Sequence, residues 1–122
     1  GTGEMPHGSI QLEVVSLGAQ LRAEADDLLS AAELAYCLGF LRAEEHMGAR
    51  VAAKRAVSRL LGGDLRHCRH QIELIREDTG PVHVRLHGEL LERAQRAGLG
   101  VPRVSLTHAA GRAAAIAWLG SR

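Results

Sequence analysis

Aromatic residues are nearly absent from this chain of 122 residues, which contains one phenylalanine, one tryptophan and one tyrosine. Surfaces that stack nucleic-acid bases need exposed aromatic rings, so this scarcity argues against such a surface. Charges of the two signs are also balanced, with 15 Lys and Arg against 14 Asp and Glu and a formal net charge of +1. A surface that follows a phosphate backbone needs a basic excess. The sequence therefore predicts no nucleic-acid partner.

Long apolar runs and a secretory signal are missing as well. No segment approaches the roughly 20 apolar residues that a membrane-spanning helix needs, and no basic start precedes an apolar stretch. Only two cysteines occur, Cys37 and Cys68, without CxxC spacing, so both are expected to be free thiols. These absences predict no membrane partner and a cytoplasmic protein.

The remaining composition is sufficient for one folded unit. Hydrophobic residues make up 46% of the chain, mostly Ala, Leu and Val, and can form a core at this length. No linker divides the sequence, so a single domain is expected over residues 1–122. The glycine-rich residues 1–7 are expected to be flexible.

Hydrophobic periodicity and turn residues predict most of the elements. Strands are expected over 10–15, 71–76 and 82–86, with a turn near 78–81, and helices over 19–29, 41–61 and 88–97. Ser30 followed three residues later by Glu33 predicts a capping box at the start of another helix. The alanine-rich segment 111–119 favours a helix by propensity alone.

The most distinctive segment is GARVAAKRAVSRLLG at residues 48–62, which contains the four cations Arg50, Lys54, Arg55 and Arg59. Because Arg50, Lys54 and Arg59 are spaced by four and five residues, we expect them to share one side of a helix, with Arg55 beside that side. Two interpretations follow from the spacing. The cations form either a solvated face of an amphipathic helix or a site for an anion.

Several motifs in the same order resemble the holo-acyl-carrier-protein synthase family of phosphopantetheinyl transferases. The segment 48–62 resembles the family's signature helix, xAGRFAAKEAxxKAxG. Four other segments also match: IQLEVVSL at 10–17 with its opening strand, LSAAELAYC at 29–37 with FTxxELxYC, QIELI and GPVHVRLHG at 71–88 with its hairpin, and VSLTHAAGRAAAIAWL at 104–119 with its closing VSISH motif. The resemblance covers nearly the whole chain. It implies an α+β, phosphopantetheinyl transferase-like fold, with an antiparallel sheet packed on one long helix and strands over 101–107 and 111–119.

The resemblance also implies an activity and an assembly. The family transfers phosphopantetheine from coenzyme A to a serine of an acyl or peptidyl carrier protein, and it forms homotrimers with sites between subunits. Arg50, Lys54 and Arg59 match basic residues of the signature helix, and His108 matches the histidine of the closing motif. The resemblance therefore implies that these four residues bind coenzyme A, with His108 contributed by a neighbouring subunit.

The chain departs from the family at its magnesium site. The resemblance implies two metal ligands, the aspartate of the first strand and the glutamate of AAKE, but Glu13 and Arg55 stand at these places. Glutamate adds a methylene to a ligand that must fit a small octahedron, and arginine has no lone pair to offer. Either Glu13 and Arg55 form a salt bridge in place of the metal, or Arg55 itself binds the diphosphate as a catalytic group. Both interpretations predict no tightly bound magnesium.

A further departure concerns the carrier protein. The family usually has an arginine six residues after the first-strand acid, where this chain has Ala19, although Arg22 follows one turn later. Two functional hypotheses therefore remain open. The chain is either a divergent phosphopantetheinyl transferase, or a degenerate or repurposed homologue that has lost magnesium-dependent transfer and acts as a binding or assembly protein or in another biosynthetic reaction.

Overall fold

The structure, a computed structural model, describes residues 10–76 and 79–119. The expectation for residues 1–7, and part of the turn expected at 78–81, lie outside the described residues. The elements in chain order are β1 (Ile10–Ser16), α1 (Leu21–Leu28), α2 (Ala31–Leu38), α3 (Ala43–Leu60), α4 (Leu65–Cys68), the 3₁₀ turn η1 (Arg69–Gln71), β2 (Ile72–Arg76), β3 (Val82–Leu86), α5 (Gly88–Arg96), β4 (Arg103–Ala109) and β5 (Arg112–Trp118).

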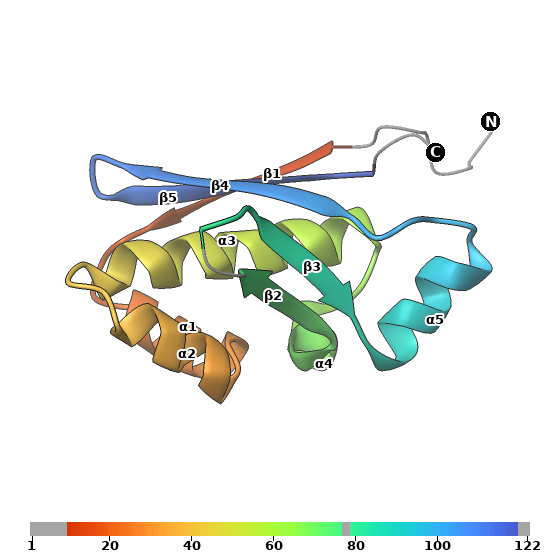
Figure 1. Cartoon of the computed structure of the whole chain (residues 1–122), viewed down its shortest axis with the longest axis horizontal. Coiled ribbons are helices and arrows are strands. Elements are labelled where there is room, and N and C mark those ends of the chain that lie inside the picture. The colour runs from red at the N-terminus through yellow and green to blue at the C-terminus, as the bar shows by residue number, and fades with distance from the viewer. Residues whose placement is uncertain (1–9, 77–78, 120–122) are drawn as a thin grey trace.

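The long helix α3 lies between two layers (Figure 1). One layer is a three-stranded antiparallel sheet in the order β1-β5-β4. The other layer contains α1, α2 and the antiparallel hairpin β2–β3. This arrangement confirms the expected α+β fold with an antiparallel sheet packed on one long helix.

The alanine-rich segment near the C-terminus is a strand, as the family resemblance implied and against its helix propensity. Ala113, Ala115 and Ala117 alternate along β5 and are buried to within 1% of full burial. Small side chains let α3 approach the sheet closely, and Gly48 leaves no room for a side chain. A Cβ added there would lie 2.5 Å from Leu17 Cδ2 and 3.0 Å from Ala113 Cβ. Tertiary packing has therefore overridden local propensity in β5.

Helix α2 begins with the expected capping box. The Glu33 amide donates to Ser30 Oγ at 3.1 Å, and the Ser30 amide donates to Glu33 Oε1 at 2.8 Å. Two of the amides that a helix start leaves unpaired are thus satisfied reciprocally. Cys37 and Cys68 are buried free thiols, as expected.

The outer sheet face, on the side away from α3, is apolar and exposed. It consists of Ile10, Leu12 and Val14 of β1 with Ala114 and Ile116 of β5, and the register places Leu12 opposite Ile116. The exposed fractions are 67% for Ile10, 56% for Leu12, 53% for Val14 and 40% for Ile116. Contiguous apolar surface of this kind is typical of an interface. Within the described ranges, no helix is both long and apolar enough to cross a membrane.

Candidate functional site

The four cations of the segment 48–62 lie on different sides of α3. Nine residues separate Arg50 from Arg59, which is about two and a half helical turns, so these two side chains leave the helix in opposite directions. The expectation that Arg50, Lys54 and Arg59 share one side is therefore wrong. Arg50 lines a pocket, Lys54 lies in the core, and Arg55 and Arg59 line a separate groove.

Lys54 is only 1% exposed, and its ammonium group is fully engaged inside the protein. Lys54 Nζ lies 2.7 Å from Glu33 Oε1 and donates to the carbonyl oxygens of Leu28 at 2.9 Å and Arg69 at 2.8 Å. An ammonium has three donors, so none is left for a ligand. Burial lowers the pKa of Lys54, and the nearby Glu33 carboxylate opposes this shift. This placement does not fit the expectation of a coenzyme A-binding Lys54.

The arginine groove, defined by Glu24, Asp27, Arg55, Arg59 and Arg66, lies between α1, α3 and α4 and has a volume of about 340 Å³. Glu24 of α1 forms an ion pair with Arg55. Three guanidinium groups thus offer hydrogen-bond donors to one cavity, and their charges are balanced by Glu24, Asp27 and, through its pair with Arg59, Glu13. The groove has the chemistry to receive an anion.

Glu13 and Arg55 are not paired with each other. Glu13, 9% exposed on the inner face of β1, accepts a hydrogen bond from Arg59 Nη1 at 2.8 Å. The expected Glu13–Arg55 salt bridge is therefore replaced by two pairs, Glu13 with Arg59 and Glu24 with Arg55. The physical reason is that Glu24 reaches Arg55 from α1, while Glu13 lies beside the next turn of α3.

The residues at the family's metal position do not fit a magnesium site. The Glu13 carboxylate oxygen that faces Arg59 also accepts from Gln11 Nε2 at 3.3 Å, and Arg55 offers only donors. Over residues 10–76 and 79–119, no cluster of three or more His, Cys, Asp or Glu could hold a metal ion. Magnesium needs several oxygen ligands in near-octahedral geometry, which these side chains do not supply.

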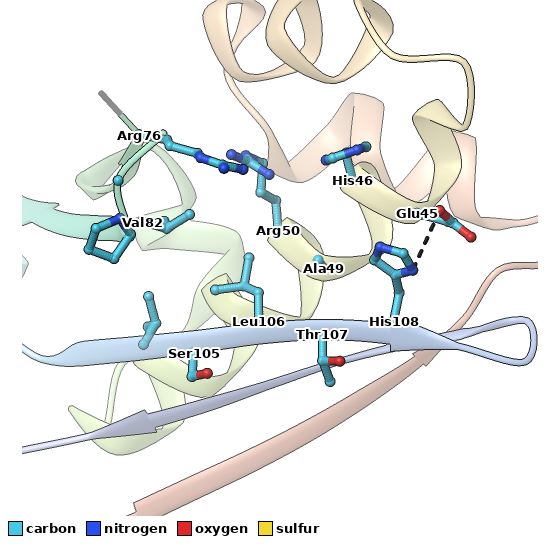
Figure 2. A pocket seen from close by; sticks show the side chains of 13 residues that line it. Glu45, His46, Ala49, Arg50, Arg76, Val82, Ser105, Leu106, Thr107 and His108 are labelled. Atoms are coloured by element: carbon cyan, nitrogen blue, oxygen red, sulfur yellow. Dashed lines mark ion pairs between the residues drawn. The ribbon is translucent and has the colours of Figure 1, made fainter. Parts of the chain in front are cut away.

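The histidine pocket, defined by Glu45, His46, Arg50, Arg76 and His108, opens between α3, the end of β2 and strand β4 (Figure 2). Its volume is about 350 Å³. His108 Nδ1 lies 3.4 Å from Glu45 Oε1. Arg50 is 4% exposed and its guanidinium carbon lies 4.4 Å from the centroid of the Tyr36 ring. Two permanent cations, Arg50 and Arg76, thus face one carboxylate in a concave site.

His46 packs against another ring in this pocket. It stacks on Phe40 with the ring centroids 3.8 Å apart. Burial lowers the pKa of His46, and Arg50, His108 and more weakly Arg76 act in the same direction, while Glu45 opposes them. The permanent positive charge of the pocket comes from Arg50 and Arg76.

The arginine groove and the histidine pocket lie on opposite sides of α3. Arg55 follows His46 by nine residues and Arg59 follows Arg50 by nine, so each pair is separated by about half a turn around the helix axis. The residues expected to bind coenzyme A are thus not brought together. Arg50 and His108 line the histidine pocket, Arg59 lines the arginine groove beside Arg55, and Lys54 lies in the core.

Sequence reasoning missed several residues that shape these sites: Glu24, Glu45, His46 and Arg76. It predicted the capping role of Glu33 but not its ion pair with Lys54. One local signal existed, because His46 precedes Arg50 by four residues on the same helix and so belongs to the same side. No local signal pairs Glu24 with Arg55, which are 31 residues apart.

Comparison with known proteins agrees with this architecture. The chain is 44% identical over 87 residues to a holo-acyl-carrier-protein synthase of Moorella thermoacetica, with 70% of this chain and 68% of that protein covered. The fold is similar to the crystal structure of the Neisseria meningitidis holo-acyl-carrier-protein synthase, with a TM-score of 0.75, 20% identity and coverage of 92% of this chain and 97% of that chain.

A second solved structure, the Helicobacter pylori holo-acyl-carrier-protein synthase in complex with coenzyme A, has a TM-score of 0.74 at 18% identity. It covers 92% of this chain and 100% of that chain. The chain matches no protein-family model. At these identities the solved structures establish the fold, and the sequence relative adds the family. With 44% identity to a protein of which it covers more than two thirds, the chain belongs to the holo-acyl-carrier-protein synthase family.

Proposed function

We propose that this protein transfers phosphopantetheine from coenzyme A to a serine of an acyl or peptidyl carrier protein. The supporting observation is the histidine pocket, in which Arg50 of the signature helix and His108 of the closing motif meet although 58 residues (108 − 50) separate them in the sequence. Two independent family motifs thus converge on one basic cavity suited to a phosphate. Family membership adds the reaction class.

The reaction requires no nucleophile from the protein. The carrier serine Oγ attacks the phosphorus that bears the pantetheine, and a new P–O bond forms. The bond from that phosphorus to the bridging oxygen of the diphosphate breaks, adenosine 3′,5′-bisphosphate leaves with that oxygen, and the serine proton passes to a base or to water. The protein positions the two substrates and stabilises the charge on the phosphate oxygens.

We also propose that the protein forms a homotrimer with the site between copies. The arginine groove and the histidine pocket lie on opposite sides of α3, so one coenzyme A molecule can contact both sets only where two copies meet. The apolar outer sheet face supplies surface for such an assembly. A cytoplasmic location stays a prediction.

The assembly is tested by light scattering coupled to gel filtration. Wild-type protein is expected to have the mass of three 13.1 kDa chains, and Leu12→Lys on the outer sheet face is expected to reduce that mass. Leu41→Lys is the matched control, because Leu41 is fully exposed and is not a residue of the outer sheet face. A monomeric wild-type protein would contradict the proposal.

Transfer is tested by intact-mass measurement on a panel of apo carrier proteins incubated with the protein and coenzyme A. A phosphopantetheine mass gain on any carrier, absent when the acceptor serine is replaced by alanine, is the expected result. The alternative, a homologue that binds or assembles without transfer, is favoured by the arginine at position 55. It would be the better explanation if no carrier gains mass while coenzyme A still binds.

A further inference from the structure

The two ion pairs of the arginine groove differ in their exposure to solvent. The side chains of Arg55 and Glu24 are 31% and 33% exposed, whereas Arg59 is 63% exposed and its partner Glu13 only 10%. Each guanidinium has five donors and uses only some of them on its carboxylate. Arg55 can therefore exchange Glu24 for a ligand without breaking the core, and Arg59 can bind a ligand with its spare donors while it stays paired with Glu13.

The groove also supplies positive charge that can offset the repulsion between a bound diphosphate and the Glu13 carboxylate. A diphosphate bound near Glu13 would be repelled by its carboxylate, and the side chains present do not form a metal site that could offset this repulsion. Arg55 and Arg59 supply two permanent positive charges at this place, and Arg66 lines the same cavity. A guanidinium matches phosphate oxygens with two parallel hydrogen bonds, which gives both charge and geometry.

We propose that the arginine groove binds the diphosphate of coenzyme A without a metal ion, through Arg55 and the spare donors of Arg59, and that Glu24 holds the Arg55 guanidinium until the diphosphate displaces it. This inference rests on the proposed function for the identity of the ligand. Arg55 thus occupies the place of a metal ligand and provides the positive charge itself.

The proposal makes Glu24 a competitor of the ligand. In the free protein, Glu24 neutralises Arg55, and this pair must break when the diphosphate binds. Removing the charge of Glu24 therefore strengthens diphosphate binding, whereas removing the charge of Arg55 weakens it. If the pair served only to join α1 to α3, the two substitutions would act in the same direction, because each breaks the same contact.

The experiment is calorimetric titration of the full chain with coenzyme A, once in EDTA and once in magnesium chloride. We expect affinities that agree within about threefold in the two buffers. We expect Arg55→Gln to weaken binding by about tenfold or more, which is typical for the loss of a charged hydrogen bond, and Glu24→Gln to tighten it by a few-fold. Dephospho-coenzyme A, which retains the diphosphate but lacks the 3′-phosphate, is expected to show the same two changes.

Arg96→Gln is the matched control. Arg96 is an exposed arginine of α5 whose Nη1 lies 3.8 Å from Glu92 Oε1, so the substitution removes the same charge outside the groove. It is expected to leave the affinity within about twofold of wild type, since a distant exposed charge is screened by salt. A loss in Arg96→Gln equal to that in Arg55→Gln would overturn the proposal, because it would reflect net charge alone.

A direct measurement of metal binding completes the test. Electron paramagnetic resonance with Mn²⁺ is expected to detect no stoichiometric ion on the wild-type protein with coenzyme A absent. Stoichiometric Mn²⁺, a gain in affinity above tenfold with magnesium, unchanged binding in Arg55→Gln, or weakened binding in Glu24→Gln would each overturn the proposal.

The two proposals fail in different ways. Metal-free, Arg55-dependent binding of coenzyme A without transfer to any carrier would support the groove and contradict the transferase. Transfer that occurs only with magnesium would support the transferase and contradict the metal-free groove.

Discussion

Lys54 and Arg55 are adjacent on α3, and each pairs with a glutamate from another helix, Glu33 of α2 or Glu24 of α1. The Lys54 pair is buried and uses every donor of the ammonium, while the Arg55 pair is about one third exposed and lines a cavity. The two ion pairs thus have the same charges but differ in burial and in the donors that they leave unused. Of these two neighbours, only Arg55 keeps spare donors that face a cavity, so only Arg55 is available to a ligand.

The largest effect that tests this comparison is expected for Lys54→Met. The substitution leaves Glu33 buried without its cation and two carbonyls without their donor, so we expect the free energy of unfolding to fall by about 3–5 kcal/mol. Urea denaturation followed by circular dichroism measures the change.

Arg55→Met is the matched control for that prediction. Because Arg55 and Glu24 are partly solvated, we expect a loss below about 1 kcal/mol. Equal losses in the two variants would contradict the distinction between a structural and an exchangeable pair.

A smaller effect is expected on the sheet side of the same helix, at Gly48. Any Cβ there meets Leu17 and Ala113, so Gly48→Val must move α3 away from β5. We expect a loss of about 1–3 kcal/mol, as for other overpacked cores, measured by the same denaturation. Gly100→Val is the control, since a Cβ at Gly100 meets no atom within 4 Å. A loss no larger than that of the control would show that the helix–sheet spacing is adjustable.

The smallest effect extends the comparison to His46, whose pKa, like that of Lys54, is lowered mainly by burial. Between its lowered pKa and the ordinary value of 6.5, folded His46 is neutral while the unfolded chain binds a proton there. The free energy of unfolding is therefore expected to fall as the pH falls through this range. Denaturation at a series of pH values between about 7 and 5 measures the slope.

His46→Phe preserves a ring that can stack on Phe40 but removes the titrating group. We expect the variant to lose part of the pH dependence. His108 and Glu45 remain in the pocket, so the difference between the two profiles reports His46 together with its electrostatic interactions with these neighbours. Parallel profiles would exclude His46 as a source of the slope.

Helices and strands were predictable from the sequence where a short motif or a regular spacing of hydrophobic residues marks them. The capping box at Ser30 and Glu33, the hairpin and the helix ends needed no information from distant residues. Strand β5 is the exception, because alanines at consecutive positions give no alternating pattern. Only the resemblance to a family predicted that strand, and its cause is the close approach of α3.

The arginine groove and the histidine pocket were less predictable. They depend on contacts between segments far apart in the sequence and on the direction in which each side chain leaves α3. Arg50 and Arg59 appear close in the sequence but point in opposite directions, so the phase determines which cavity each one lines. The partner of Arg55 is a residue of α1 that carries no mark of its role. The sequence shows arginine at position 55, where the family resemblance implies a metal ligand. Only the structure shows that Arg55 pairs with Glu24.

Glu33 contacts three elements at once, and this has a consequence for local motions. One carboxylate caps α2 at Ser30, pairs with Lys54 of α3 and accepts the Leu74 amide of β2 at 3.0 Å. Unwinding α2 alone would leave the buried Lys54 ammonium and the Leu74 amide without the Glu33 carboxylate, so local opening of this eight-residue helix costs a large free energy. The amide protons of Ser30, Glu33 and Leu74, which these contacts engage, should therefore exchange with solvent deuterium only when the whole domain unfolds.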